Sequence, residues 1–127
     1  MSIEGRITQD GNILIPGFLC KQDLKIQTNF VLDTGFVGYD VAIPYDAKEK
    51  LQLKPTGPTV KYKLAVGVEY PFLTGNDANV CFENYVYNIS YIIINTPYPL
   101  LSVTFLKNIS KILLVDFVNE RTIILLN

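Results

Sequence analysis

The sequence of 127 residues contains no histidine and only two cysteines, Cys20 and Cys81. Without histidine, the chain cannot build a Ser-His-Asp or Cys-His nucleophilic site, nor the usual shell of a zinc hydrolase. Two cysteines are too few for a disulfide framework or a zinc site, so we expect buried, reduced thiols that pack as small hydrophobic side chains. If the protein is an enzyme, its chemistry must depend on carboxylates, lysines or a cofactor, and we expect no metal.

Runs of like charge and long apolar stretches are also absent. The formal net charge is −1, and nothing in the charge pattern indicates a nucleic-acid-binding surface. No apolar stretch approaches the roughly 18 to 20 residues that cross a bilayer. The first residues lack the basic and apolar regions of a signal peptide. We therefore expect a cytoplasmic protein that binds neither nucleic acid nor membranes.

The pattern that is present is typical of a β protein. Hydrophobic residues make up 49% of the chain, and its length fits one domain, residues 1–127. Short segments rich in β-branched and aromatic residues alternate with turn signals, which predicts an all-β barrel or sandwich. The expected strands are 6–9, 12–16, 27–32, 41–44, two within 60–73, 85–95, 112–117 and 122–126. The expected helices are 46–53, with Asp46 as N-cap, and 102–109, and a turn is expected at 74–77.

An aspartate stands at the end of the most apolar early strand. Asp33 follows the apolar residues 30–32, and Thr34 and Gly35 come next, before the chain becomes apolar again. Asp-Thr-Gly is also common in turns that end strands, where the carboxylate accepts hydrogen bonds from the following backbone amides. The apolar flanks and a second glycine, Gly38, favour a short loop within a sheet whose backbone closely approaches another group.

The segment VLDTGFVGYDVAIP resembles the active-site segment of the retropepsin-like aspartic proteases, especially their single-domain archaeal and bacterial members. Nearer the C-terminus, the apolar pair Leu100-Leu101, a predicted helix and a VDF strand match a second part of the family pattern. Between these two parts, KLAVGVEY falls where the family has its flap hairpin. The resemblance places the flap tip at Ala65, Val66 and Gly67.

This resemblance implies an all-β, closed or partly open acid-protease barrel with one or two short helices and a flap hairpin. It implies an aspartic endopeptidase that hydrolyses peptides or proteins without a cofactor. Two carboxylates would share one proton and activate a water molecule. Asp33 is the implied catalytic residue, and Thr34 and Gly35 support its loop, the Thr34 hydroxyl tying two such loops together.

A homodimer follows from the single Asp-Thr-Gly segment, because a chain of 127 residues cannot hold both lobes of a pepsin-like enzyme. A twofold axis would bring one Asp33 from each subunit into a dyad. The resemblance also implies that the terminal strand, 122–126, interleaves with the partner's chain ends, the alternative being an ordinary buried strand within the same subunit. Because that strand is almost wholly apolar, we expect both of its faces to be covered.

The chain departs from the family pattern at two positions. Ser102 stands where the family has a glycine after the apolar pair, and Val66 stands at the flap tip where relatives often have a polar residue. An alternative function is therefore a protease-like fold that binds peptides or a partner without cutting. Other acidic residues are scattered without metal-ligand spacing and are interpreted as structural: Asp40, Asp77, Glu83 and Asp116.

Overall fold

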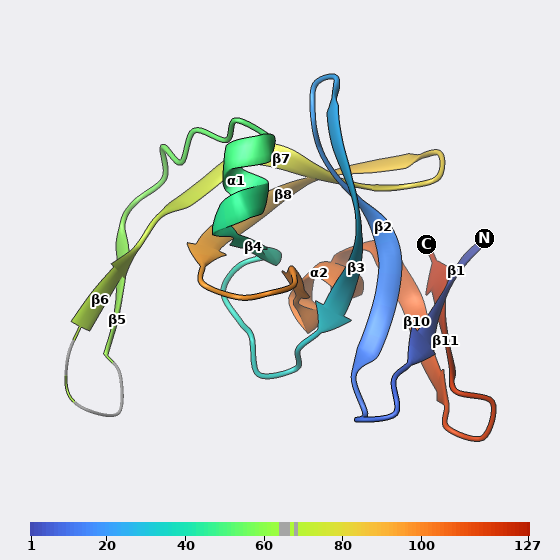
Figure 1. Ribbon diagram of the computed structural model, residues 1–127. Coiled ribbons are helices and arrows are strands. Elements are labelled where there is room, and N and C mark those ends of the chain that lie inside the picture. Colours follow the sequence, from blue (N-terminus) through green and yellow to red (C-terminus); the bar gives the residue numbers. More distant parts are fainter. Residues whose placement is uncertain (64–66, 68) are drawn as a thin grey trace.

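The computed structural model of the chain describes residues 1–63, 67 and 69–127 (Figure 1). The strands are β1 (Ser2–Ile7), β2 (Ile13–Lys21), β3 (Leu24–Leu32), β4 (Val41–Pro44), β5 (Val60–Lys63), β6 (Glu69–Phe72), β7 (Thr74–Phe82), β8 (Tyr85–Ile94), β9 (Leu100–Leu101), β10 (Ser110–Asp116) and β11 (Arg121–Leu126). The helices are α1 (Tyr45–Lys50) and α2 (Val103–Ile109). Within the described residues, neither helix has the length and apolar character needed to span a membrane.

Six strands close into a barrel. In the order β2-β3-β9-β4-β8-β7, each strand is hydrogen-bonded to the next, and β7 pairs with β2 to complete the circle. The two-residue strand β9 lies between β3, to which it is parallel, and β4, to which it is antiparallel. The predicted all-β barrel with short helices is thus confirmed. β9 was not predicted as a strand, because two residues show no periodicity.

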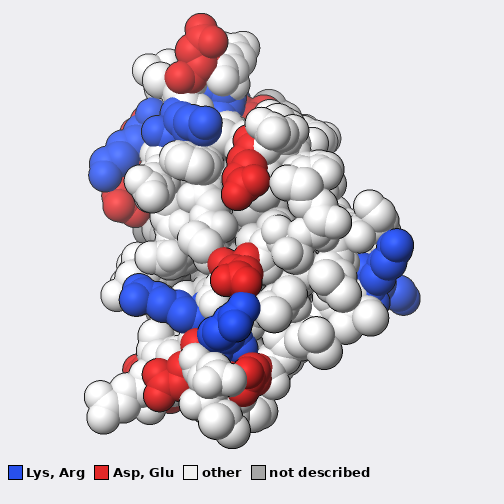
Figure 2. Space-filling view, turned by 90° about the vertical axis from the view of Figure 1, so that its right-hand side faces the viewer, with Lys and Arg blue, Asp and Glu red and all other residues white. Residues whose placement is uncertain are grey.

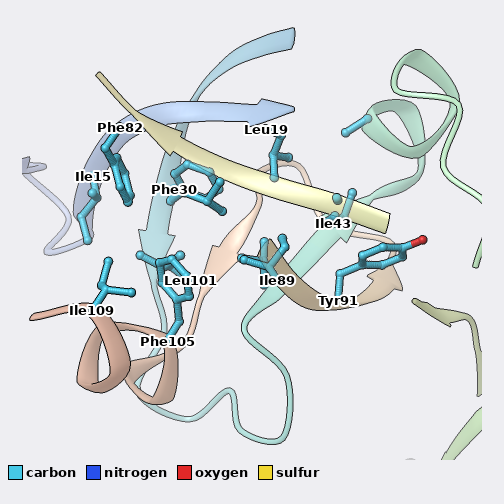
Figure 3. Close-up of a cluster of buried hydrophobic side chains, with 14 of the residues drawn as sticks. Ile15, Leu19, Phe30, Ile43, Phe82, Ile89, Tyr91, Leu101, Phe105 and Ile109 are labelled. Carbon is cyan, nitrogen blue, oxygen red and sulfur yellow. The ribbon is translucent and has the colours of Figure 1, made fainter. Parts of the chain in front are cut away.

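The core fills this barrel with side chains from all six barrel strands and both helices. Phe30 from β3 and Leu101 from β9 are fully buried and lie near Phe105 of α2 (Figure 3). The rings of Phe30 and Phe82 meet edge to face with centroids 6.2 Å apart. Each such side chain contributes about 1.5–3 kcal/mol relative to an exposed one. The apolar residues before Asp33 are therefore held in place by the core.

A three-stranded extension, β10-β11-β1, continues the sheet beyond β2. β11 pairs with β1 on one edge and with β10 on the other, within the same subunit. The prediction that segment 122–126 interleaves with a partner is therefore wrong, because this strand has no free edge. Its side chains also alternate: Thr122, Ile124 and Leu126 are buried and the residues between them are half-buried, so within one subunit only one face is fully covered.

Two local predictions differ from the structure. The N-cap of α1 is Pro44 rather than Asp46, without a side-chain hydrogen bond, because the proline ring presets a backbone angle from which a helix can start. The expected turn at 74–77 is part of β7, which has a register shift between Gly75 and Ala78. Gly75 is needed there, since a Cβ would lie 2.3 Å from the Tyr91 hydroxyl.

The two cysteines, Cys20 and Cys81, are buried and free, as predicted. Burial, together with the neighbouring Cys81 thiol, raises the pKa of Cys20 to about 12. Since the thiolate is the reactive form, the Cys20 thiol is inert at neutral pH and packs as a small hydrophobic group.

Candidate active site

The Asp33 loop, residues 33–40, connects β3 to β4. Its side chains Thr34 and Val37 are exposed, and Asp33 is half-buried. The Gly35 amide donates a hydrogen bond to Asp33 Oδ1 at 2.9 Å, and the Phe36 amide donates to the Asp33 carbonyl at 3.2 Å. Within the described part of the chain, Asp33 Oδ2 has no hydrogen-bond partner, so this oxygen is available to another group.

One buried peptide group holds both ends of the Asp33 loop. The Leu101 carbonyl accepts a hydrogen bond from the Asp33 amide at 3.1 Å, and the Ser102 amide donates to the Asp40 carbonyl at 3.0 Å. This C=O and N–H belong to the same planar peptide unit, and both residues are fully buried. The separation of the two loop ends is therefore fixed by a rigid group, whereas the exposed middle of the loop makes few contacts.

Ser102 has a clear local role at the position where it departs from the family pattern. It is the N-cap of α2, and its hydroxyl oxygen accepts a hydrogen bond from the Phe105 amide at 3.1 Å. Its φ of −84° and ψ of 154° are extended backbone that any residue adopts. Serine therefore replaces glycine here without strain and adds a helix cap.

Comparisons with known proteins identify the fold. Neither a family model nor a curated protein matches the chain. A solved structure does: a retropepsin-like aspartic protease from Rickettsia conorii matches with a TM-score of 0.71 and 19% sequence identity. The match covers 98% of this chain and 89% of that one. The chain has the retropepsin-like fold.

In this retropepsin-like fold, the β5–β6 hairpin corresponds to the segment predicted as the flap. Its strands are antiparallel, with Val60 opposite Phe72, and they form a separate two-stranded sheet that extends away from the barrel (Figure 1). Its base is fixed where the Gly57 amide donates to the Thr74 carbonyl at 3.0 Å and the Thr74 hydroxyl donates to the Pro58 carbonyl at 2.5 Å.

The predicted flap tip is described only in part. Ala65 and Val66 lie outside the described residues, and Gly67 is exposed with a φ of +84°. That angle lies in the left-handed region, which glycine adopts without steric cost, so it suits a tight connection between two strands. The site roles of Asp33, Thr34, Gly35 and the tip residues stay predictions.

Asp77 is at the centre of a network that the sequence did not reveal. Its carboxylate accepts hydrogen bonds from Lys21 Nζ at 3.0 Å, from the Lys54 amide at 2.8 Å and from the buried Tyr91 hydroxyl. Burial alone raises the pKa of Asp77, but the hydrogen bonds from Tyr91, Lys54 and Lys21 outweigh it and the net shift is downward. Burial, together with the contact to Asp77, raises the pKa of Tyr91.

This Asp77 network (Lys21, Lys54, Asp77 and Tyr91) joins β2, β7, β8 and the chain after α1. No sequence signal could have found it, because its members come from four separate segments. Among the described residues, no three His, Cys, Asp or Glu side chains lie close enough together to hold a metal ion. Two hollows on the described surface, of about 360 and 220 Å³, are lined by residues outside the Asp33 loop.

Proposed function

We propose that the chain is a homodimeric aspartic endopeptidase, with one Asp33 from each subunit in a catalytic dyad. The observation that carries this proposal is the Asp33 carboxylate itself. It follows a buried strand, its loop is fixed at both ends by one peptide group, and its Oδ2 has no partner among the described residues. A cytoplasmic location is part of the proposal, and the free thiols are compatible with it.

The chemistry requires both subunits, because one subunit has only half of the dyad. Two carboxylates a few ångströms apart cannot both ionise, so they share one proton. The ionised carboxylate removes a proton from a water molecule, which attacks the peptide carbonyl while the protonated carboxyl donates a hydrogen bond to the carbonyl oxygen. The tetrahedral intermediate then loses its C–N bond, and the leaving amine takes up a proton.

The proposed substrate is an extended segment of a peptide or protein. Such a segment would lie between the two Asp33 loops and the two β5–β6 hairpins, with Ala65, Val66 and Gly67 nearest to it. In Figure 1 the Asp33 loop, this hairpin and the β10–β11 turn extend toward the lower side of the view. A partner that packs against this side would meet all three.

The proposed contact with the partner runs along the edge of β10 that no described strand pairs with. This strand is the last of its sheet, and Ile112 and Leu114 are 48% and 51% exposed. An unpaired edge with apolar side chains invites pairing with another strand. The face that Figure 2 shows, which includes the terminal strands, carries scattered charges of both signs without a patch of one sign. Such a surface does not oppose contact between identical copies.

Twofold symmetry limits the register of an antiparallel β10–β10 contact. If the axis passes through Leu113, Ile112 of each copy lies opposite Leu114 of the other. An axis one residue to either side would place one of these apolar residues opposite Ser110 or Asp116. Of these three registers, the one centred on Leu113 is therefore the one that places neither Ile112 nor Leu114 opposite a polar residue.

The catalytic proposal is tested by Asp33→Asn. We expect the wild type to cleave a denatured protein mixture between acidic and neutral pH, and the variant to lose at least about 10³-fold in rate, because acid–base catalysis by the dyad is removed. Thermal unfolding serves as the control for folding. A folded Asp33→Asn protein that cleaves at the wild-type rate would contradict the assignment. A wild type that binds peptides but never cleaves them would favour the alternative of a noncatalytic binding module.

The contact is tested by charge exchange on β10, read by sedimentation. Ile112→Lys and Leu114→Glu should each shift the dimer toward monomer, since each buries an unpaired charge. The double variant should recover the dimer, because the introduced charges of the two copies then lie opposite each other. Val86→Lys, at a position 65% exposed on β8, is the matched control. Single variants that remain fully dimeric would place the contact elsewhere.

A further inference from the structure

Asp40 is the most densely bonded residue of the Asp33 loop. Its amide donates to both the carbonyl oxygen and the hydroxyl oxygen of Ser90, each at 3.1 Å. Its carboxylate Oδ2 accepts a hydrogen bond from the Ser90 amide at 2.9 Å. Its carbonyl accepts from the Ser102 amide at 3.0 Å. One residue thus joins the end of the loop to β8 and to the junction between β9 and α2.

We propose that Asp40 is a positioning residue for Asp33, acting through its side-chain carboxylate. The carboxylate holds the last residue of the loop on Ser90 of β8. In this position the Asp40 carbonyl accepts a hydrogen bond from the Ser102 amide. The carbonyl of the same Leu101–Ser102 peptide group accepts a hydrogen bond from the Asp33 amide at the other end of the loop. The effect on catalysis rests on the proposed function, whereas the effect on loop order does not.

The middle of the loop cannot provide this order by itself. Thr34, Gly35 and Val37 are exposed, and Gly38 has a φ of +96° with nothing within 4 Å of where a Cβ would be. The position of the Asp33 carboxylate therefore depends on how firmly the two loop ends are held. At the Asp40 end, loss of the carboxylate leaves the Ser90 amide without its acceptor. Asp40 is then held only by its backbone hydrogen bonds, one of which goes to the Ser90 hydroxyl.

The chemistry of the contact predicts which substitutions are tolerated. Asparagine has a side-chain carbonyl oxygen in nearly the same place as Asp40 Oδ2, so Asp40→Asn keeps an acceptor for the Ser90 amide. Alanine has none. A role that depended on negative charge would fail in both variants, whereas a positioning role fails only in Asp40→Ala.

The first test compares kcat and KM of the dimeric wild type with Asp40→Ala and Asp40→Asn. We expect Asp40→Ala to lower kcat by about 10- to 100-fold, as a small misplacement of a catalytic group does, with KM within about twofold. Asp40→Asn should recover kcat to within about threefold of wild type. Asp77→Ala is the matched control. It also removes a carboxylate that accepts a hydrogen bond from a backbone amide, but Asp77 does not contact the Asp33 loop.

The control separates positioning from general loss of stability. Asp77→Ala should lower the unfolding temperature at least as much as Asp40→Ala does and leave kcat within about twofold of wild type. An equal fall of kcat in both alanine variants, or no recovery in Asp40→Asn, would overturn the proposal.

The second test does not need peptidase activity, so it distinguishes failure of this proposal from failure of the proposed function. Amide hydrogen exchange is measured by NMR at Asp33 and Ser102, with the Leu126 amide, which donates to the Met1 carbonyl, as reference. Asp40→Ala should accelerate hydrogen exchange at the Asp33 and Ser102 amides by tenfold or more relative to the Leu126 amide. Unchanged exchange at Asp33 would overturn the positioning role, whether or not the wild type cleaves peptides.

Discussion

Asp33 and Asp77 are two carboxylates on one barrel with opposite surroundings. Asp77 accepts hydrogen bonds from an ammonium group, a backbone amide and a buried hydroxyl. Asp33 accepts one, from the Gly35 amide of its own loop, and its neighbours Thr34 and Val37 are exposed. A fully bonded carboxylate holds the scaffold together, whereas one with a free oxygen on a firmly held loop is available to a substrate, a water molecule or a second carboxylate.

The largest contrast is expected between Asp77→Ala and Asp33→Ala in thermal or urea unfolding. Asp77→Ala should lower the free energy of unfolding by about 2–4 kcal/mol, because it leaves the Tyr91 hydroxyl buried without its partner and removes a charge-assisted hydrogen bond. Asp33→Ala should change the free energy by less than about 0.5 kcal/mol, since few contacts are lost. Equal losses in the two variants would show that Asp33 also has a scaffold role.

The pH dependence of stability should sharpen the same contrast. Because hydrogen bonds hold the folded-state pKa of Asp77 below its ordinary value, its contribution is complete above that ordinary value, near pH 4, and is lost as the pH falls through the folded-state pKa. Wild-type unfolding temperatures should therefore fall steeply below about pH 4.

The matched variant for this pH profile is Asp77→Asn, whose unfolding temperature should fall less steeply over the same range. Some slope remains, because the Asn119 side chain and the Asn119 and Val118 amides lower the pKa of Asp116 too. Parallel profiles for the wild type and Asp77→Asn would show that Asp77 does not contribute to the acid sensitivity of the fold.

The smallest effect is expected at Ser102, where side chain and backbone have different roles. Ser102→Ala removes the N-cap of α2 and should lower the free energy of unfolding by about 1 kcal/mol, whereas Ser102→Gly should cost only a few tenths. Both variants keep the backbone amide that donates to Asp40. Chemical denaturation distinguishes the two, and a loss in Ser102→Ala well above 2 kcal/mol would indicate a second role for the hydroxyl.

Much of the fold was predictable from local patterns in the sequence. The strand at 41–44 and the two strands around Gly67 match β4, β5 and β6, because alternating or β-branched residues between turn signals give a strong local signal. The terminal strand was misjudged because its apolar residues show no alternation, although the structure buries only every second one. Sequence alone does not reveal which edges of a strand are already paired.

The candidate site was predictable only as a segment. Asp33, Thr34 and Gly35 form a contiguous motif, so the sequence singled them out. Asp40 and Ser90 were missed because their contact joins residues far apart in the chain, and a single carboxylate with no recognisable spacing gives no local signal. The peptide group at Leu101 and Ser102 was missed for the same reason, since its role depends on strand order.

The peptide group that bridges the Asp33 loop also has a consequence for the order of folding. Asp33 finds its backbone acceptor on Leu101, late in the chain, so β9 must insert between β3 and β4 before the Asp33 end of the loop is held. Contacts of such long sequence separation form slowly, because loop closure must precede them. A chain that has been synthesised only as far as β8 therefore contains Ser90, which binds the Asp40 end of the loop, but lacks the acceptor for the Asp33 amide. The Asp33 loop is held at both ends only when nearly the whole barrel has closed.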